Sequence, residues 1–242
     1  MDHNSASRIW AIVPAAGTGS RMQTSLPKQY MPLLGRPVML HTLERLCAHP
    51  RVVGVLVGIA PDDRWWPTLA RDVSRLPEIL GTFIGGSERA DTVNNGLKAL
   101  ATHASPGDWV LVHDAARPCV RTTDIDNLIE QVDGHADGGL LALPMADTVK
   151  RTDDRQIVSE TVPRANLWRA QTPQLFPLTR LSEALARALA AGDVVTDEAA
   201  AVERVGGRPR VIAGHADNIK ITVDEDMALA ELFIKRQQKE QM

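Results

Sequence analysis

Acidic residues are missing from the first part of the chain. No Asp or Glu occurs in residues 3–43, although the 30 acidic residues of the whole chain slightly outnumber its 27 Lys and Arg. The same stretch contains four cations, Arg8, Arg21, Lys28 and Arg36. The net charge of −3 gives no reason to expect a nucleic acid or an anionic membrane as a partner. Positive charge concentrated in one segment of a slightly acidic chain indicates a small anionic ligand instead.

Aromatic residues, cysteines and long apolar runs are also scarce. With 4% aromatics and one tyrosine, Tyr30, the chain lacks the stacking platforms typical of proteins that bind single-stranded nucleic acid. Two cysteines, Cys47 and Cys119, do not make a disulfide framework and indicate a reducing compartment. There is no run of about 18 apolar residues, so no transmembrane helix is expected. Residues 1–7 lack the apolar core of a signal peptide, so we expect a flexible N-terminus and a cytoplasmic location.

Apolar, strand-like runs alternate with amphipathic segments along the first 143 residues. The strands are predicted over residues 9–13, 52–59, 79–84, 109–113 and 139–143. The helices are predicted over residues 38–48, 62–75, 89–101 and 124–132, the second of them interrupted by Pro67. Nearly continuous apolar strands in this spacing indicate an α/β fold with a doubly wound, mostly parallel sheet that helices cover on both faces. The length fits a single domain over residues 8–238.

The pattern changes after residue 143. Residues 147–161 alternate polar and apolar around a turn at Asp153-Asp154, which predicts an exposed hairpin arm. Because bare strand edges are a liability, such an arm commonly meets a partner chain; an ordinary surface excursion is the alternative.

The remaining elements are predicted from helix and strand signals. Helices are expected over residues 178–191 and from Thr196, which has the side chain of a good N-cap and acids in the first turn. A strand over residues 210–213 precedes Thr222-Val-Asp-Glu225, which predicts a capping box opening a last helix over residues 225–237.

Residues 14–28 form a glycine-bearing, acid-free loop after the first apolar strand. Glycine allows backbone N–H groups to converge on an anion, while Arg21 and Lys28 add a planar fork and a mobile point charge. In open α/β sheets ligands bind at the carboxyl ends of strands. The loop therefore predicts phosphate binding, with a solvent-exposed basic turn as the alternative. It is neither a dinucleotide fingerprint, since Met22 replaces the third glycine, nor a P-loop, since Gln29 follows the lysine.

Two further motifs follow predicted strands. An apolar strand ends at His113-Asp114, which places the Asp114 carboxylate on the same sheet edge as the basic loop. A carboxylate beside phosphate-binding cations indicates Mg²⁺; a helix or turn cap is the alternative. The second motif, Gly85-Gly86-Ser87 with Thr92, permits close approach of a ligand and polar contacts to the edge of a base. Ser87 is also a candidate N-cap of the next helix, and both roles are compatible.

Seven motifs occur in order along the chain. They are Pro14-Ala-Ala-Gly-x-Gly-x-Arg21-Met, Pro27-Lys28-Gln-Tyr, Gly85-Gly-x-Glu-Arg-x-x-Thr92, His113-Asp-Ala-Ala-Arg-Pro118, Leu167-Trp-x-x-Gln-Thr-Pro-Gln174, Thr196-Asp-Glu198 and Asp217-Asn-Ile-Lys220. In this combination the chain closely resembles the 2-C-methyl-D-erythritol 4-phosphate cytidylyltransferase family of the non-mevalonate isoprenoid pathway. The resemblance runs from about Ile9 to the last helix. Two departures concern detail: the family often has Asp at Ser87 and Ser at Thr92.

The resemblance implies a fold of the nucleotide-diphospho-sugar-transferase type and a reaction that moves CMP from CTP to 2-C-methyl-D-erythritol 4-phosphate. The products are 4-diphosphocytidyl-2-C-methyl-D-erythritol and pyrophosphate. An oxygen of the acceptor phosphate attacks the α-phosphorus in line, so no protein nucleophile is required. Catalysis then rests on positioning and charge stabilisation, with Mg²⁺ or another divalent cation as cofactor.

The resemblance also assigns roles to individual residues. It gives the catalytic role to Arg21, Lys28 and Lys220. It gives nucleotide binding to Pro14, Ala15, Ala16, Gly17, Gly19, Gly86, Ser87 and Thr92. It gives acceptor binding to Asp114, Arg117, Thr148, Arg164, Thr172, Thr196 and Lys220. Asp114 would also hold the metal, with Asp217 as a possible second carboxylate. Thr148 and Arg164 would reach the acceptor across a homodimer formed through the arm, whereas a surface ion pair is the alternative for Arg164.

Four alternatives remain at this level. The first is the same chemistry on ribitol 5-phosphate, which an assay offering both acceptors would separate. The second is a sugar-1-phosphate nucleotidyltransferase that uses another base. The short chain and the His113–Pro118 motif disfavour this class. The third is an oxidoreductase, disfavoured by Met22. The fourth is a non-enzymatic binding module, disfavoured because the candidate residues Arg21, Lys28, Asp114 and Lys220 are all present.

Overall fold

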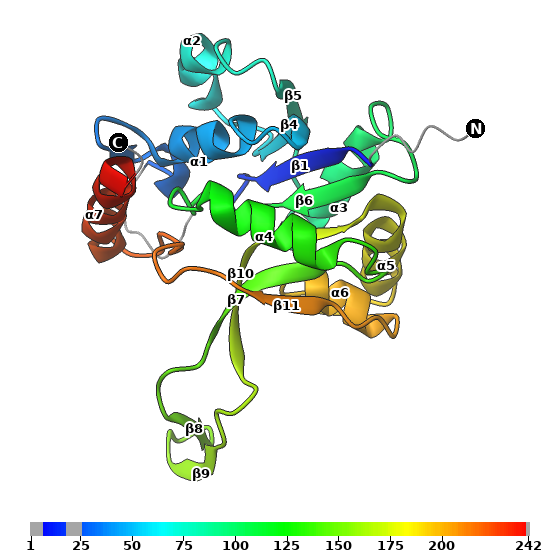
Figure 1. Ribbon diagram of the computed structural model, residues 1–242, viewed down its shortest axis with the longest axis vertical. Coiled ribbons are helices and arrows are strands. Elements are labelled where there is room, and N and C mark those ends of the chain that lie inside the picture. The colour runs from blue at the N-terminus through cyan, green and yellow to red at the C-terminus, as the bar shows by residue number, and fades with distance from the viewer. Residues whose placement is uncertain (1–6, 18–25, 241–242) are drawn as a thin grey trace.

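The computed structural model describes residues 7–17 and 26–240. A seven-stranded sheet forms its centre, with helices on both faces and a long arm at one end (Figure 1). The strand order is β11-β7-β10-β6-β1-β4-β5. Their bounds are β1 Ile9–Pro14, β4 Val52–Ile59, β5 Ile79–Ile84, β6 Trp109–Val112, β7 Gly139–Pro144, β10 Trp168–Pro177 and β11 Arg210–Ala213. All neighbours pair in parallel except β10, which is antiparallel to both β6 and β7. The prediction of a doubly wound, mostly parallel sheet is confirmed.

The apolar strand sequences reflect burial on both faces of the sheet. In β1, Ala11 and Val13 pack into one hydrophobic cluster, and Trp10 and Ile12 pack into the other. This division follows from the two-residue period of a strand. Helices α1 (Val38–Cys47) and α4 (Thr122–Val132) cover the first face. Helices α3 (Arg89–Leu100), α5 (Leu178–Ala190) and α6 (Glu198–Arg204) cover the second.

A third, smaller cluster attaches the last helix, α7 (Glu225–Glu240), to the body of the protein. It joins α7 to a short hairpin of β2 (Pro32–Leu33) and β3 (Arg36–Pro37), which follows the 3₁₀ turn η1 (Lys28–Tyr30). Buried Leu33, Ile221 and Ile234 contribute its side chains. This packing brings the segment before α7 to the same end of the molecule as the first loop.

Strand β10 was not predicted from the sequence. It lies in the middle of the sheet, and its register with β7 shifts between Ala170 and Gln174. Pro173 stands in this irregular stretch, and proline inside a run argues against a central strand because it lacks the N–H that a ladder needs. The polar residues Gln171, Thr172 and Gln174 are buried there. The same irregularity carries Thr172 to the end of β6.

The helix predicted over residues 62–75 is wrong. The segment contains a 3₁₀ turn, η2 (Trp66–Leu69), and a single helical turn, α2 (Ala70–Val73). Asp63 Oδ1 accepts the N–H groups of both Trp65 and Trp66 at 2.9 Å, and Pro67 has no N–H. A side chain that binds nearby backbone in this way competes with a regular helix.

Two predicted N-caps are displaced by one residue. The cap of α6 is Asp197, whose carboxylate accepts the Ala200 N–H at 2.9 Å, rather than Thr196. The cap of α3 is Glu88, rather than Ser87, and it forms a capping box with Asp91. In both cases a carboxylate takes the position, and it suits the positive end of the helix better than a hydroxyl.

The predicted capping box of α7 is also wrong in detail. The Asp226 carboxylate, rather than Glu225, accepts the Thr222 N–H at 2.7 Å and the Thr222 hydroxyl at 2.9 Å. Its shorter side chain accepts the Val223 N–H as well, at 3.1 Å. The segment before α7 is therefore folded back onto the first turn of the helix.

The arm projects away from the sheet on extended chain that follows β7 and precedes β10 (Figure 1). Its tip is the antiparallel pair β8 (Val149–Thr152) and β9 (Val158–Val162), as the alternation in residues 147–161 predicted. Asp153 closes the turn by accepting the N–H groups of Arg155 and Ile157 at 2.9 Å. The arm is largely exposed, and its role in dimerisation stays a prediction.

Three earlier expectations concern residues outside the described ranges. Gly19 and Arg21 fall in the gap between residues 17 and 26, and of the N-terminal segment 1–7 only Ser7 is described. In the part of the chain that is described, no helix is both long and apolar enough to cross a membrane.

Candidate active site

A cavity of about 480 Å³ opens at the carboxyl ends of β1, β5 and β6. The backbone segments that follow these strands line it, namely residues 14–17, 86–89 and 114–116. Lys28, Gln29, Thr92, Lys220 and Thr222 complete the lining. The chain order reverses at this point, because β4 and β5 lie on one side of β1 and β6 lies on the other. Such a switch point is where open α/β sheets bind ligands.

Buried Gln29 holds the first loop from inside. Its amide nitrogen donates to the carbonyl oxygens of Ala15 at 2.6 Å and Gly17 at 3.0 Å. The loop backbone is thereby fixed next to Lys28, which lines the cavity. The sequence analysis missed this role of Gln29, because an amide that follows a lysine carries no signal of its own. Of the predicted residues in this loop, Pro14, Ala15, Ala16 and Gly17 line the cavity.

The second loop packs directly against the first. A Cβ on Gly85 would lie 2.4 Å from the Ala16 Cβ, and one on Gly86 would lie 2.2 Å from the Asp91 Cβ. Gly85 is therefore needed for the two loops to approach each other, and Gly86 is needed for the second loop to pack against the first turn of α3. The buried Thr92 hydroxyl accepts the Gly86 N–H at 3.0 Å and donates to the Glu88 carbonyl at 3.1 Å. Gly86, Ser87 and Thr92 all line the cavity, so the structure brings these three predicted residues together.

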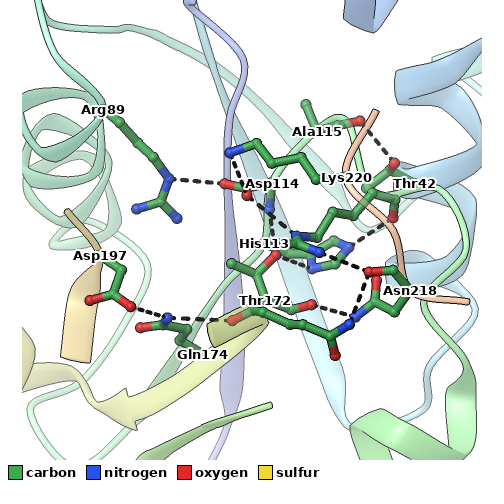
Figure 2. A network of polar contacts seen from close by, with 12 residues as sticks. Thr42, Arg89, His113, Asp114, Ala115, Thr172, Gln174, Asp197, Asn218 and Lys220 are labelled. Carbon is green, nitrogen blue, oxygen red and sulfur yellow. Dashed lines mark hydrogen bonds and ion pairs between the residues drawn. The ribbon is translucent and has the colours of Figure 1, made fainter. Parts of the chain in front are cut away.

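The Asp114 carboxylate lies at the centre of a cationic cluster (Figure 2). Its Oδ1 accepts from Arg89 Nε at 2.9 Å, while its Oδ2 pairs with Lys220 Nζ at 2.9 Å and Arg117 Nε at 3.5 Å. Burial raises the pKa of Asp114, but Arg89, Lys220 and Arg117 outweigh it and hold the pKa far below its ordinary value. The group is therefore a carboxylate at any physiological pH.

Arg89 and Glu198 form a second ion pair behind Asp114. Arg89 Nη1 and Nη2 donate to the two Glu198 oxygens at 2.6 and 3.1 Å. Glu198 is only 2% exposed, and burial raises its pKa, although Arg89 opposes this effect. The sequence analysis quoted both residues within motifs but gave them no role. Their pairing joins the first residue of α3 to the first residue of α6, a contact that no local sequence pattern specifies.

Hydrogen bonds determine the state of buried His113. Its Nε2 lies 3.1 Å from the Arg117 carbonyl, which only accepts, so Nε2 carries the proton. Nδ1 then accepts the Thr172 hydroxyl at 2.9 Å, and the Thr172 oxygen accepts the Asp114 N–H at 3.1 Å. Burial lowers the pKa of His113 to about 4. His113 is therefore a neutral residue that orients its neighbours, with both ring nitrogens in use.

We expect His113 to make the protein less stable in mild acid. The unfolded chain takes up a proton near pH 6.5 while the folded protein resists until about pH 4, so stability falls as the pH drops through this window. The loss should reach about 3 kcal/mol. Urea unfolding at several pH values measures it. Because Gln does not titrate, the free energy of unfolding of His113→Gln should depend less on pH between about pH 4 and pH 6.5. An unchanged pH dependence in that variant would contradict the assignment.

Other predicted residues lie outside the cavity lining. Thr172 is 4% exposed, and its hydroxyl is engaged by His113 and Asp114. Arg117 lies behind Asp114 and donates to the Asn218 carbonyl at 2.8 Å. Exposed Thr196 precedes the α6 cap. The structure does not bring these three side chains into the cavity.

Two predicted residues lie in the arm, on either side of the β8–β9 pair, and one lies on the far side of the Lys220 segment. Thr148 and Arg164 are exposed, and the Arg164 guanidinium donates to the Ala146 carbonyl. Buried Asp217 is paired with Arg121 at 2.5 Å. It also accepts from Gln237 at 3.0 Å, and it does not line the cavity. The structure therefore does not bring Asp217 into the site, and its role as a second carboxylate has no support from this arrangement.

The fold and the cavity together define a class of protein. A doubly wound sheet presents two glycine-bearing loops at its switch point, with Lys28 and Lys220 in the same cavity. This arrangement is typical of an α/β nucleotidyltransferase, in which cations surround a nucleoside triphosphate.

Comparison with known proteins narrows the class. Residues 9–236 match the family of 2-C-methyl-D-erythritol 4-phosphate cytidylyltransferases. The enzyme of that name from Hahella chejuensis is 45% identical over 241 residues, covering 100% of this chain and 99% of that protein. The one from Vibrio vulnificus is 46% identical over 233 residues, covering 96% and 97%. The crystal structure of the Francisella tularensis enzyme superposes with a TM-score of 0.79 at 36% identity, covering 94% of this chain and 100% of that one.

The chain belongs to the 2-C-methyl-D-erythritol 4-phosphate cytidylyltransferase family. It is thus an enzyme of isoprenoid precursor biosynthesis that transfers CMP from CTP to 2-C-methyl-D-erythritol 4-phosphate. These matches favour this acceptor over ribitol 5-phosphate. They also exclude the sugar-1-phosphate nucleotidyltransferase, the oxidoreductase and the non-enzymatic binding module considered from the sequence.

Proposed function

We propose that the cavity at the β1–β6 switch point performs this transfer, with the triphosphate against residues 14–17 and Lys28 and the acceptor phosphate near Lys220. The observation that carries the proposal is that Lys28 and Lys220, far apart in sequence, line one cavity with both glycine loops. Two ammonium groups in one cavity supply the charge that a triphosphate and a phosphate monoester need when they meet. Arg21 would add a third cation from the same loop.

The chemistry needs positioning rather than a protein base. A phosphate monoester is already ionised near neutral pH. In-line attack on the α-phosphorus spreads charge over the equatorial oxygens and the leaving pyrophosphate, and preorganised cations stabilise that charge. Both ring nitrogens of neutral His113 are occupied, which agrees with a mechanism without a histidine base.

We propose that the loop at residues 85–92 binds the cytosine. Gly86 and Thr92 fix the loop backbone through their own hydrogen bond, and Ser87 is exposed beside them with its hydroxyl on Asp91 at 2.9 Å. Because the Gly85–Ala16 contact closes the two loops together, the pocket favours a compact pyrimidine ring over a purine. Main-chain groups of Ala15, Ala16 and Gly17 would face the ribose and phosphates.

The fit of Mg²⁺ to Asp114 is limited by the cations around that residue. Both carboxylate oxygens are already paired, and a metal bound directly to Asp114 would displace Lys220 or Arg117. We therefore propose that the divalent cation arrives with CTP, held by phosphate oxygens and water as Mg²⁺ prefers. Bound there, it would neutralise the polyphosphate. This replaces the expectation that Asp114 is itself the metal ligand.

We also propose that the enzyme is a cytoplasmic homodimer joined through the arm. The arm extends clear of the sheet and exposes Ile157 and Val158, which are 61% and 55% exposed. Thr148 and Arg164, which flank the β8–β9 pair of the arm, would reach the acceptor in the partner's cavity. Two free, buried cysteines agree with a reducing compartment.

A direct assay tests the proposed activity. The purified protein, CTP and Mg²⁺ are offered 2-C-methyl-D-erythritol 4-phosphate or ribitol 5-phosphate, and pyrophosphate release is measured. Release with the first acceptor alone is the expected result. Turnover only with ribitol 5-phosphate, or none with either, would contradict the proposal.

The shared site predicts complementation between two damaged chains. Arg164→Ala should raise KM for the acceptor more than KM for CTP, because only the acceptor meets the partner's arm. Co-expressed with Lys28→Ala, it should restore about a quarter of wild-type activity, since half of random dimers carry one intact site. Each variant expressed alone is the control, because neither homodimer contains an intact site. No restoration in the first mixture would exclude a site shared between subunits.

A further inference from the structure

Arg89 is a cavity-lining cation whose guanidinium binds two carboxylates through all three of its nitrogens. Its Nε donates to Asp114 at 2.9 Å, and its Nη1 and Nη2 donate to Glu198 at 2.6 and 3.1 Å. A planar fork held at three nitrogens has one orientation. Arg89 therefore lies at the phosphate site but is turned away from a phosphate ligand.

The frame that holds Glu198 is rigid. Gln174, in the central strand β10, donates to Asp197 Oδ2 at 2.9 Å (Figure 2). Its side-chain oxygen accepts the Ala199 N–H at 2.9 Å. Both sequence neighbours of Glu198 are thus tied to the sheet by one side chain. Glu198 is the first residue of α6 and is buried, so its carboxylate is held in position to bind Arg89.

The ion pair of Arg89 with Glu198 is connected to Lys220 through Asp114. Because Arg89 takes Oδ1, the other oxygen of Asp114 faces Lys220 at 2.9 Å. Figure 2 shows Arg89 and Lys220 on opposite sides of this carboxylate. Arg89 also directly follows the second loop, as the first residue of α3. One chain of ion pairs therefore runs from the frame of α6 to the ammonium group in the cavity.

We propose that Arg89 and Glu198 are positioning residues for the reaction, a role that rests on the proposed function of the cavity. Arg89 binds Oδ1 of Asp114 and orients the carboxylate so that Oδ2 holds Lys220 toward the acceptor phosphate. Glu198 keeps Arg89 in that orientation and withholds its charge from the triphosphate. Arg89, Arg117 and Lys220 all pair with Asp114. Without Glu198, Arg89 would lose its second carboxylate, and Asp114 alone would balance the charge of these three cations.

A purely structural role makes a different prediction. Replacing both members of a buried ion pair by apolar side chains of similar volume is often neutral or stabilising. If the pair served the fold alone, the double variant Arg89→Met/Glu198→Met would keep full activity. The positioning role requires that the same folded variant bind the acceptor poorly.

The experiment compares Arg89→Met, Glu198→Gln and the double variant with wild type. Urea unfolding reports folding, and KM for each substrate and kcat report the site. Arg89→Met and the double variant should raise KM for the acceptor about 10- to 100-fold, the range expected for a misplaced binding group. KM for CTP should change little in the double variant. Arg180→Met, which breaks the pair of Arg180 with Asp137 at 2.9 Å outside the cavity, is the matched control and should keep both KM values.

Glu198→Gln provides a readout of opposite sign. It releases Arg89 toward the triphosphate, so KM for CTP should fall while KM for the acceptor rises. Arg89→Lys should not rescue Arg89→Met, because an ammonium group cannot bridge two carboxylates as the fork does. An unchanged acceptor KM in the folded double variant, or equal rises in both KM values, would overturn the inference. Absence of turnover by wild type would instead reject the proposed function.

Discussion

Replacement of Lys28 by Ala should lower kcat by about 100- to 1,000-fold, the cost of removing one preorganised charge-stabilising group. Lys28 lines the cavity beside the loop that Gln29 fixes, where the α-phosphate and the leaving pyrophosphate are expected. The charge on these groups grows in the transition state, so the loss should fall on kcat more than on KM for CTP. The folding stability should change little, because the side chain is only partly buried.

Single-turnover kinetics and thermal unfolding of the same preparation test this expectation. Lys98→Ala, an exposed lysine on α3, is the control and should leave kcat unchanged. Lys28→Arg should retain part of the activity, since the charge remains but its geometry differs. Turnover by Lys28→Ala at the wild-type rate would show that charge at this position is not used.

Asp114→Asn should be the second severe substitution, because it affects both folding and acceptor binding. The amide keeps the shape of the side chain but leaves Arg89, Arg117 and Lys220 without the carboxylate that they share. Breaking a buried ion pair by removing one partner costs about 3 kcal/mol or more. Lys220 also loses its fixed position, so kcat/KM for the acceptor should fall about 100-fold.

The pH dependence of that variant has a defined sign. The pKa of Asp114 is lowered in the folded protein, so its contribution to stability is present above about pH 4 and is lost as the pH falls further. The stability difference between wild type and Asp114→Asn should therefore shrink in strong acid. Urea unfolding from pH 3 to pH 7 measures this trend. Asp137→Asn, outside the cavity, controls for loss of an acidic ion pair without loss of activity. A deficit independent of pH would contradict the ion-pair account.

Much of the site was predictable because parallel strands end at one edge. Two glycines, two cations and the absence of acids predicted the role of the loop after β1. The place of Asp114 after an apolar strand predicted its position at the same edge. Once these strands are parallel neighbours, residues 14–17 and Asp114 must lie close together. Lys220 came from the family resemblance, and its ion pair with Asp114 brings it to the same place.

Other features depended on contacts that the local sequence does not encode. β10 is antiparallel in the centre of a parallel sheet, and its Pro173 and buried amides concealed it. The caps at Asp197 and Asp226 differ by one residue from those expected, since several short polar side chains compete for the same N–H groups. The Asp217 carboxylate forms an ion pair with Arg121 and does not face the cavity.

By itself, the sequence determined the α/β class, the glycine-bearing loop after the first strand, the exposed arm and, through its motifs, the family. These features rest on periodicity, glycine placement and charge, which act over a few residues. Only the tertiary structure decided the state of His113, the pairing of Arg89 with Glu198 and the surroundings of Asp114. The physical reason is that a buried charge needs partners, and packing distant elements together determines which partners it has.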